Sequence, residues 1–304
     1  MSEELRDDLR HRLEERKTQF DEASARIEEK AGRNLFFAIG SGLVFGAVFL
    51  LSLFLAKPVF AGVVALLVIV ALIELATAYR GAGRRVPRIG VAISGLFILF
   101  GAYQYGAKGM LGGFVAGLIV LGVWRLVEGL VPQWEVPPKT LVRDVFSGLF
   151  TLAYVALLAS IAILIVHGES GEWWVFTLVA VVVSVDVGAY AAGVTLGKHK
   201  MTPRISPNKT WEGFAGAVVA GVTVAIICAV FLLELPWWLG GLLGVMLVIT
   251  ATIGDLTESL IKRNLGVKDM SSWVPGHGGF LDRLDSLLPS TVPVYFIMVI
   301  TGSV

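Results

Sequence analysis

The sequence predicts an all-α integral membrane protein, a polytopic bundle of about nine transmembrane helices. Three observations support this class. The 304-residue chain is 56% hydrophobic and only 16% charged. Apolar windows of about 20 residues recur along it, which is long enough to cross the hydrocarbon core of a bilayer. Lys and Arg gather in every second connection between the windows, as expected of loops that alternate between the two sides of a membrane.

Residues 1–33 form a charged extension ahead of the first apolar window. They contain one stripe of apolar residues at spacings of four or seven, which is a helical pattern: Leu5, Leu9, Leu13, Phe20 and Ile27. Such a helix would lie on a membrane surface or bind a partner. The alternative, which we favour, is a solvated cytosolic extension. We expect no cleavable signal peptide, because the stretch has no apolar core.

Nine apolar segments follow this extension. They cover roughly residues 34–55, 58–78, 88–106, 110–128, 145–166, 173–196, 213–233, 236–256 and 287–303. The first four belong to a unit of N-terminal membrane helices, 34–140, and the other five to a C-terminal unit, 141–304. The single cysteine, Cys228, lies in the seventh segment and excludes an intrachain disulfide.

The distribution of Lys and Arg orients the chain in the membrane. Five alternate stretches, beginning with the N-terminal tail, hold 23 of the 25 basic residues, and the other five hold only Lys57 and Lys108. By the positive-inside rule, the N-terminus is cytosolic and the C-terminus lies outside. An error in the number of segments would break the alternation, so the count supports nine.

The most polar stretch near the predicted bilayer runs from Gly254 to Ser286, between the last two apolar segments. Acids and bases at this depth are costly and usually mark a functional site. Its carboxylates are hard oxygen ligands suited to Mg²⁺: Asp255, Asp282 and Asp285. Its bases suit phosphate oxygens: Lys262, Arg263, Lys268 and Arg283. Together these side chains predict phosphoryl or nucleotidyl transfer to or from a lipid.

A glycine-rich turn lies inside the same stretch, around His277. Pro275, Gly276, Gly278 and Gly279 allow a tight backbone that approaches a ligand closely. His277 is then a general base, a hydrogen-bond donor to phosphate, or a residue that stabilises the turn; the sequence leaves these three roles open.

A second polar cluster follows the sixth apolar segment, from Asp186 to Gly216. Asp186 interrupts an apolar run, where a carboxylate is more often functional than a packing residue bonded to a neighbouring hydroxyl. Further along, a predicted turn opens the next helix and offers a phosphate cradle of side chains and backbone N–H groups: Ser206, Asn208, Lys209 and Thr210. No Walker motif, hydrolase triad signature or zinc spacing is present in the sequence.

These residues resemble the signature of the phosphatidate cytidylyltransferases, which are CDP-diacylglycerol synthases. The resemblance covers most of the C-terminal half in the expected order, and its central part joins many fixed residue types over 27 positions. The matching stretches are Asp186–Tyr190, Ser206–Gly213, Ser259–Arg263, Lys268–Asp269 and Pro275–Asp285. Residues 1–140 show no comparably specific motif.

The resemblance implies an enzyme that makes CDP-diacylglycerol and pyrophosphate from CTP and phosphatidate. It also implies a homodimer in the bacterial inner membrane, with a polar catalytic cavity open to the cytosol and the membrane. Mg²⁺ would be held by Asp255 and Asp282, with a second, monovalent cation such as K⁺ nearby. Asp186 and Asp285 correspond to further acidic positions of the metal centre.

The resemblance also distributes the remaining site residues between two roles. The catalytic set comprises Asp255, Asp282, Lys209, Lys262, Arg263 and His277. The substrate-binding set comprises Ser206, Asn208, Lys209, Thr210, Lys268, Arg283, Gly278 and Gly279.

Two other functions compete with this interpretation. A CTP-dependent lipid kinase of the polyprenol-kinase type would transfer the γ-phosphate and release CDP. A transporter would distribute paired polar sites through the bilayer and show an inverted repeat, whereas here the polar residues gather at one end of the last four segments. The net charge of +1 gives no indication of a nucleic-acid partner.

Overall fold

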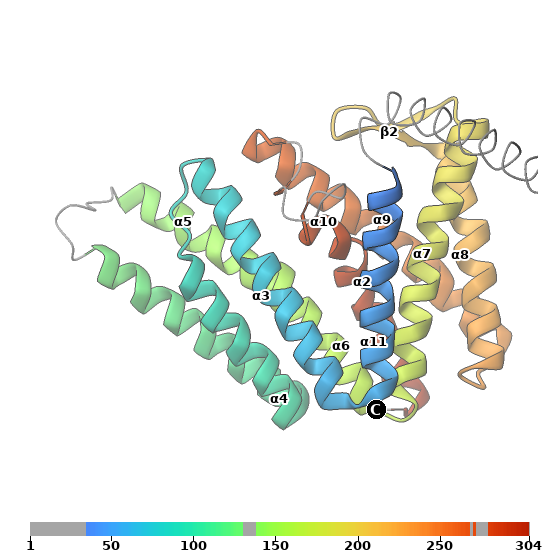
Figure 1. Cartoon of the computed structure of the whole chain (residues 1–304), viewed down its shortest axis with the longest axis horizontal. Coiled ribbons are helices and arrows are strands. Elements are labelled where there is room, and N and C mark those ends of the chain that lie inside the picture. Colours follow the sequence, from blue (N-terminus) through green and yellow to red (C-terminus); the bar gives the residue numbers. More distant parts are fainter. Residues whose placement is uncertain (1–34, 130–137, 268–269, 272–278, 304) are drawn as a thin grey trace, which may run out of the picture.

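The computed structural model describes residues 35–129, 138–267, 270–271 and 279–303. This part of the chain is almost entirely helical, with one two-stranded hairpin (Figure 1). In chain order its elements are α2 (Leu35–Leu55), α3 (Lys57–Gly81), α4 (Arg88–Gly129), α5 (Pro138–Thr151), η2 (Leu152–Leu157), α6 (Leu158–His167), α7 (Gly171–Leu196), β1 (Lys200–Thr202), β2 (Ser206–Thr210), α8 (Trp211–Phe231), α9 (Trp237–Leu265), α10 (Leu281–Leu284) and α11 (Leu287–Thr301).

Among the described residues, seven helical stretches are long and apolar enough to cross a membrane. They are Lys57–Gly81, Arg88–Glu128, Thr140–His167, Gly171–Leu196, Trp211–Phe231, Trp237–Leu265 and Leu281–Thr301. A shorter apolar helix, Val44–Leu55, precedes them. The predicted class, an all-α membrane protein, is therefore confirmed. The sequence predicts nine segments, whereas this criterion finds seven helices among the described residues. The difference arises because only the short helix Val44–Leu55 of α2 was counted, and because α4 counts once although two segments were predicted there.

Helix α4 consists of two arms rather than one continuous rod. Gly106 interrupts it with φ 63° and ψ −148°, a conformation that glycine adopts without steric cost. A Cβ atom at Gly113 would meet the carbonyl of Phe97, so residues before and after the turn lie against each other. The two arms are visible side by side in Figure 1. They correspond to the predicted segments 88–106 and 110–128.

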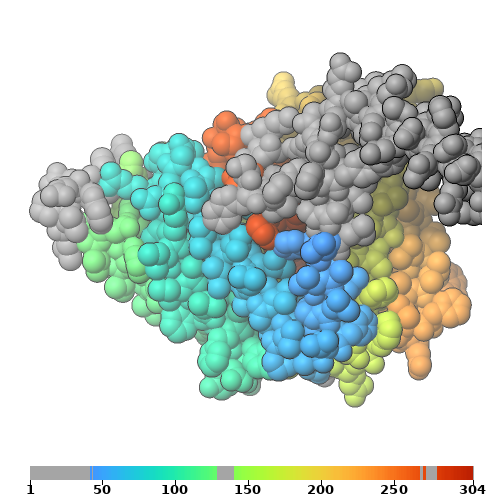
Figure 2. Space-filling model, viewed as in Figure 1, coloured from blue at the N-terminus to red at the C-terminus, as the bar shows by residue number. Residues whose placement is uncertain are grey.

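The rod formed by α5, η2 and α6 lies among α3, α4, α7 and α11, and its η2 and α6 part is largely buried. The most apolar 18-residue window of the stretch Thr140–His167 is 67% buried, the highest share among the seven stretches. Helices α3 and α4 pack against one side of this rod, and α11 joins it to α7 and α9. Helix α2 lies between α3 and α7 on the face shown in Figure 2. The apolar core thus connects the N-terminal and C-terminal units.

A short hairpin connects α7 to α8 at one end of the bundle (Figure 1). Strands β1 and β2 are antiparallel, with Lys200 opposite Thr210 and Thr202 opposite Ser206. The prediction of a turn over Ser206–Thr210 is therefore wrong, because the backbone pairs with Lys200–Thr202 as a strand. The prediction that a helix opens directly afterwards is confirmed. Thr210 is its N-cap, and its hydroxyl accepts a hydrogen bond from the Gly213 N–H at 3.1 Å.

Candidate active site

A cavity of about 310 Å³ lies between α7, α8, α9 and the hairpin. Its apolar walls come from the three helices, and polar side chains line its hairpin end. Six residues that the sequence places in a site line this one cavity: Asp186, Ser206, Asn208, Lys209, Thr210 and Asp255. The structure therefore brings together the two polar clusters, which are well separated along the chain.

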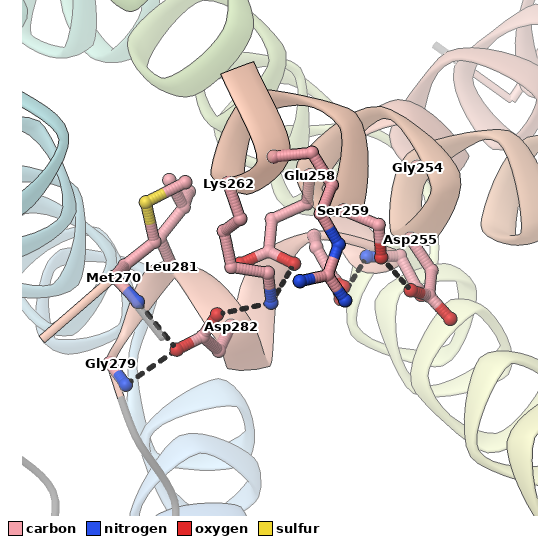
Figure 3. Close-up of polar contacts among 12 residues, drawn as sticks. Gly254, Asp255, Glu258, Ser259, Lys262, Met270, Gly279, Leu281 and Asp282 are labelled. Atoms are coloured by element: carbon pink, nitrogen blue, oxygen red, sulfur yellow. Dashed lines mark hydrogen bonds and ion pairs between the residues drawn. The ribbon is translucent and has the colours of Figure 1, made fainter. Parts of the chain in front are cut away.

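An ion pair joins the two clusters directly. Lys209 of β2 places its Nζ 2.6 Å from Oδ2 of Asp255 on α9. The side chains are 23% and 34% exposed, so both remain accessible from the cavity. Asp255 also accepts a hydrogen bond from the Ser259 hydroxyl one helical turn later, at 3.4 Å (Figure 3). A base suited to phosphate thus lies beside a carboxylate suited to a metal ion.

Three carboxylates meet at the α9 end of the site. Asp255, Glu258 and Asp285 each direct one oxygen to a point where all three lie within 4.8 Å of one another. Asp255 and Glu258 share a face of α9 because they are three residues apart. Asp285 arrives from the junction of α10 and α11, where its carbonyl lies so close to Gly254 that a Cβ atom there would overlap it. Carboxylates this close repel one another, and protonation or a bound cation relieves this repulsion.

Glu258 is the member of this group that lacks a complete set of partners. Its side chain is 1% exposed, and within the described residues its Oε1 has no hydrogen-bond partner. A buried carboxylate oxygen without a partner is costly. An all-oxygen donor set with one unsatisfied ligand fits a hard cation such as Mg²⁺. Glu258 is not among the site residues predicted from the sequence, and its spacing of three from Asp255 is the only sequence signal that points to it.

Lys262 and Asp282 form a second group beside the first (Figure 3). Lys262 Nζ lies 2.5 Å from Oε2 of Glu258 and 2.9 Å from Oδ1 of Asp282. The other oxygen of Asp282 accepts hydrogen bonds from the backbone N–H of Gly279 at 2.7 Å and of Met270 at 3.4 Å. Among the described residues, the partners of Asp282 are thus Lys262 and the residues Met270 and Gly279, which lie on either side of the glycine-rich loop, residues 272–278. It lies outside the group of three carboxylates.

A tyrosine from the rod of α5, η2 and α6 supports α9 at this point. The π-helical segment η2 carries Tyr154, whose hydroxyl lies 3.4 Å from the carbonyl of Gly254. Such wide turns often occur at functional sites. The sequence contains no comparable signal for Tyr154, since it lies in an ordinary apolar segment.

The remaining predicted site residues fall into three groups. Arg263 donates through Nε to the carbonyl of Ile205 at 3.4 Å and so ties α9 to the hairpin, while Arg283 is exposed on α10. Gly279 lies at the described end of the glycine-rich loop, against Glu74 of α3. Lys268, Asp269, His277 and Gly278 lie outside the described residues.

Comparison with known proteins adds independent information. The sequence profile of the Cytidylyltransferase family matches residues 37–301. A phosphatidate cytidylyltransferase of Mycobacterium bovis is 41% identical over 278 residues, which cover 88% of this chain and 90% of that protein. One from Mycobacterium leprae is 42% identical over 283 residues, 90% of this chain and 91% of that protein. One from Brucella melitensis is 38% identical over 190 residues, 62% of this chain and 65% of that protein.

Proposed function

The chain belongs to the cytidylyltransferase family, and we propose that its phosphatidate cytidylyltransferase reaction takes place where the cavity meets the three carboxylates. The reaction transfers CMP from CTP to phosphatidate and releases pyrophosphate. The observation that supports this location best is the ion pair between Lys209 and Asp255, because it joins a cavity of suitable size to a group of metal-type ligands. The cavity that would bind the substrates and the carboxylates that would bind the metal ion then meet at Asp255.

The reaction requires no nucleophile from the protein. A phosphate oxygen of phosphatidate attacks the α-phosphorus of CTP, the bond from that phosphorus to the oxygen bridging the β-phosphate breaks, and pyrophosphate leaves. The task of the protein is to hold two polyanions together and to stabilise the charge that develops on the leaving group. Lys209 is placed to bind phosphate oxygens in the cavity, and Lys262 lies next to the carboxylates. We assign Arg263, Arg283, Lys268 and His277 to the same substrates on the basis of the family signature.

Mg²⁺ is the cation that we propose for Asp255, Glu258 and Asp285, whose oxygens converge. When bound, it would act as a Lewis acid on the triphosphate. Asp186, in the cavity wall, is the position that we propose for a second, monovalent cation such as K⁺. Asp282 would act on the metal group indirectly, through Lys262 and the loop ends that it binds.

We further propose that the site faces the cytosol of a bacterial cell and that the enzyme is a homodimer in the inner membrane. In this arrangement α2, α3, the two arms of α4, the α5–α6 rod, α7, α8, α9 and α11 make nine crossings. The start of α8, the ends of α7 and α9 and the hairpin then share the side that carries most of the Lys and Arg residues. CTP reaches the cavity from this side, and phosphatidate reaches it from the bilayer.

The test is an assay of the purified protein in detergent with phosphatidate, Mg²⁺ and CTP labelled in either the cytidine or the γ-phosphate. We expect cytidine label in the lipid, release of pyrophosphate, and loss of both in Asp255→Asn or after chelation of Mg²⁺. Incorporation of γ-label with release of CDP would instead identify a lipid kinase. No transfer of either label would contradict the proposal.

A further inference from the structure

We propose that Glu74, in the N-terminal unit, is a positioning residue for this reaction because it holds Ser271, Phe280 and Leu281 in place beside Asp282. The inference rests on the proposed function and adds to it a residue from the half of the chain in which the sequence shows no motif. Glu74 lies on α3, about two helical turns before the end of that helix at Gly81. Its side chain is 1% exposed.

The carboxylate of Glu74 binds both described ends of the loop. Its Oε1 accepts a hydrogen bond from the Phe280 N–H at 3.2 Å, and its Oε2 accepts one from the Leu281 N–H at 2.8 Å. The Ser271 hydroxyl, on the other side of the loop, also donates to Oε1. One side chain of α3 therefore fixes residues that precede and follow residues 272–278.

Asp282 binds the backbone next to the same residues. It binds the N–H groups of Met270 and Gly279, each of which is adjacent in sequence to a residue that Glu74 binds. Asp282 also pairs with Lys262, which pairs with Glu258. Four consecutive contacts thus lead from α3 through the loop to the carboxylates that we propose as metal ligands.

The approach of Glu74 to the loop is close enough to restrict the residue type at position 279. A Cβ atom added to Gly279 would overlap the carboxyl group of Glu74. Glycine at this position therefore lets the loop backbone lie directly on the side chain of α3. Packing alone would be served by an apolar residue at position 74, since a carboxylate inside a membrane helix is costly. The hydrogen bonds to the loop are the benefit that offsets this cost.

The test compares Glu74→Gln with Glu128→Gln in the purified full-length enzyme. Glu128 belongs to the same unit and pairs with buried Arg125, outside the proposed site, so its variant controls for the loss of a structural carboxylate. Gln at position 74 keeps the shape but places an amide group where one of two oxygens accepted hydrogen bonds. We expect kcat to fall about 10- to 100-fold in Glu74→Gln, the range typical of groups that orient site ligands. We expect KM for CTP to change less than threefold and Glu128→Gln to keep its turnover.

Two further measurements separate positioning from general stability. Amide hydrogen exchange should increase at Phe280 and Leu281 in Glu74→Gln but not in Glu128→Gln. Ser271→Ala should lower kcat in the wild-type background and have little additional effect in Glu74→Gln, because both changes release the same contact. Equal losses of turnover in the two Gln variants, or unchanged exchange at the loop, would overturn the proposal.

The activity of the wild-type enzyme separates the failure of the proposed function from the failure of the role of Glu74. A wild-type enzyme that transfers no cytidylyl group refutes the proposed function, whereas an active wild type with an equally active Glu74→Gln refutes only the role of Glu74. If Glu74→Gln cannot be recovered in folded form, Ser271→Ala alone decides: a lower kcat with faster exchange at Phe280 supports the role, and unchanged values reject it.

Discussion

Lys209 and Asp255 are held 2.6 Å apart although both side chains are partly exposed. Ion pairs of this kind contribute little to stability, at most about 1 kcal/mol. Their position at the junction of the cavity and the carboxylate group is therefore better explained by ligand binding than by folding. Removal of Lys209 should therefore affect substrate binding directly.

Lys209→Ala should lower kcat/KM for CTP by about 10- to 100-fold, because a hydrogen bond to a charged group is worth about 1.5–3 kcal/mol. Steady-state kinetics in detergent measure this value. Lys198→Ala is a suitable control, since Lys198 is an exposed base of the same connection and does not line the cavity. Equal kinetics of the wild type and Lys209→Ala would remove Lys209 from the site.

Asp282→Asn should lower turnover more than 100-fold while the chain still inserts into the membrane. The amide would keep one acceptor for the loop N–H groups or for Lys262, but not the charge that balances Lys262. Such a loss leaves a largely buried ammonium group with only Glu258 as its described carboxylate partner, which is unfavourable. Activity per mole of monodisperse protein is the measurement, and near-normal turnover would contradict the proposed role.

The sequence named most residues of the candidate site, but it did not give all the contacts among them. The motif placed Lys209, Asp255 and Asp285 in one site, and the structure brings them together. Glu258 received no role although it lies three residues after Asp255. Which face of α9 meets Asp285 depends on how α9 crosses α11, and helical periodicity does not encode a crossing. That Asp282 itself holds the metal ion stays a prediction from the sequence, and its contacts with Lys262 and Gly279 lead us to propose an indirect role instead.

At the level of elements, the contact between α9 and α11 sets the spacing of the carboxylates. Gly254 precedes Asp255 and lies against the carbonyl of Asp285 and the ring of Pro289. Because a backbone atom is the neighbour, a larger residue at position 254 cannot be accommodated by a change of rotamer. Any added atom must separate the two helices.

Gly254→Ala should therefore reduce both stability and activity. Overpacking of this kind costs about 1–3 kcal/mol, and the separation would move Asp285 away from Asp255 and Glu258. Gly241→Ala is a matched control on the same helix, where the new methyl group would only touch Ile226 at 3.9 Å. Thermal unfolding and kcat of both variants provide the comparison; if they behave alike, the α9–α11 spacing is not critical.

The helical elements were more predictable than the hairpin between α7 and α8. Long apolar runs have a minimum length in a bilayer, so the helical class and the approximate limits of most helices follow from hydropathy, while the predicted number of nine differs from the seven long apolar helices found among the described residues. Even the turn within α4 appears in the sequence as a gap between two segments, near Gly106. Strands of three and five residues carry too little periodicity to be recognised, and β2 was therefore expected to be a turn.

At the scale of the whole molecule, the proposed orientation predicts which connections are accessible from each side. In a Cys228→Ala background, Glu234→Cys should react with a membrane-impermeant maleimide in intact bacterial spheroplasts. Lys200→Cys should react only after permeabilisation, because the hairpin lies on the proposed cytosolic side. Both positions are exposed in the structure, so burial does not limit labelling. The opposite labelling pattern would reverse the orientation.

The sequence motifs all lie in the C-terminal unit, but in the structure a residue of the N-terminal unit, Glu74, contacts the candidate site. Hydropathy treats α3 as one apolar segment, and the single carboxylate within it has no neighbouring signal. Its partners Phe280 and Leu281 lie 206 and 207 residues away. A contact at such a separation is invisible to spacing rules, which relate residues within one element. The fold class was thus predictable, while the connection between the two units was not.

This separation also has a consequence for the synthesis of the protein. Chains are made at about 5–20 residues per second, so α3 is complete some 10–40 seconds before Leu281 is added, given the 207 residues between Glu74 and its partner. During this interval Glu74 has none of its loop donors, yet its helix is ready to enter the bilayer. The side chain of Glu74 must therefore enter the bilayer without its final partners, and we expect the integration of α3 to depend on the rate of translation.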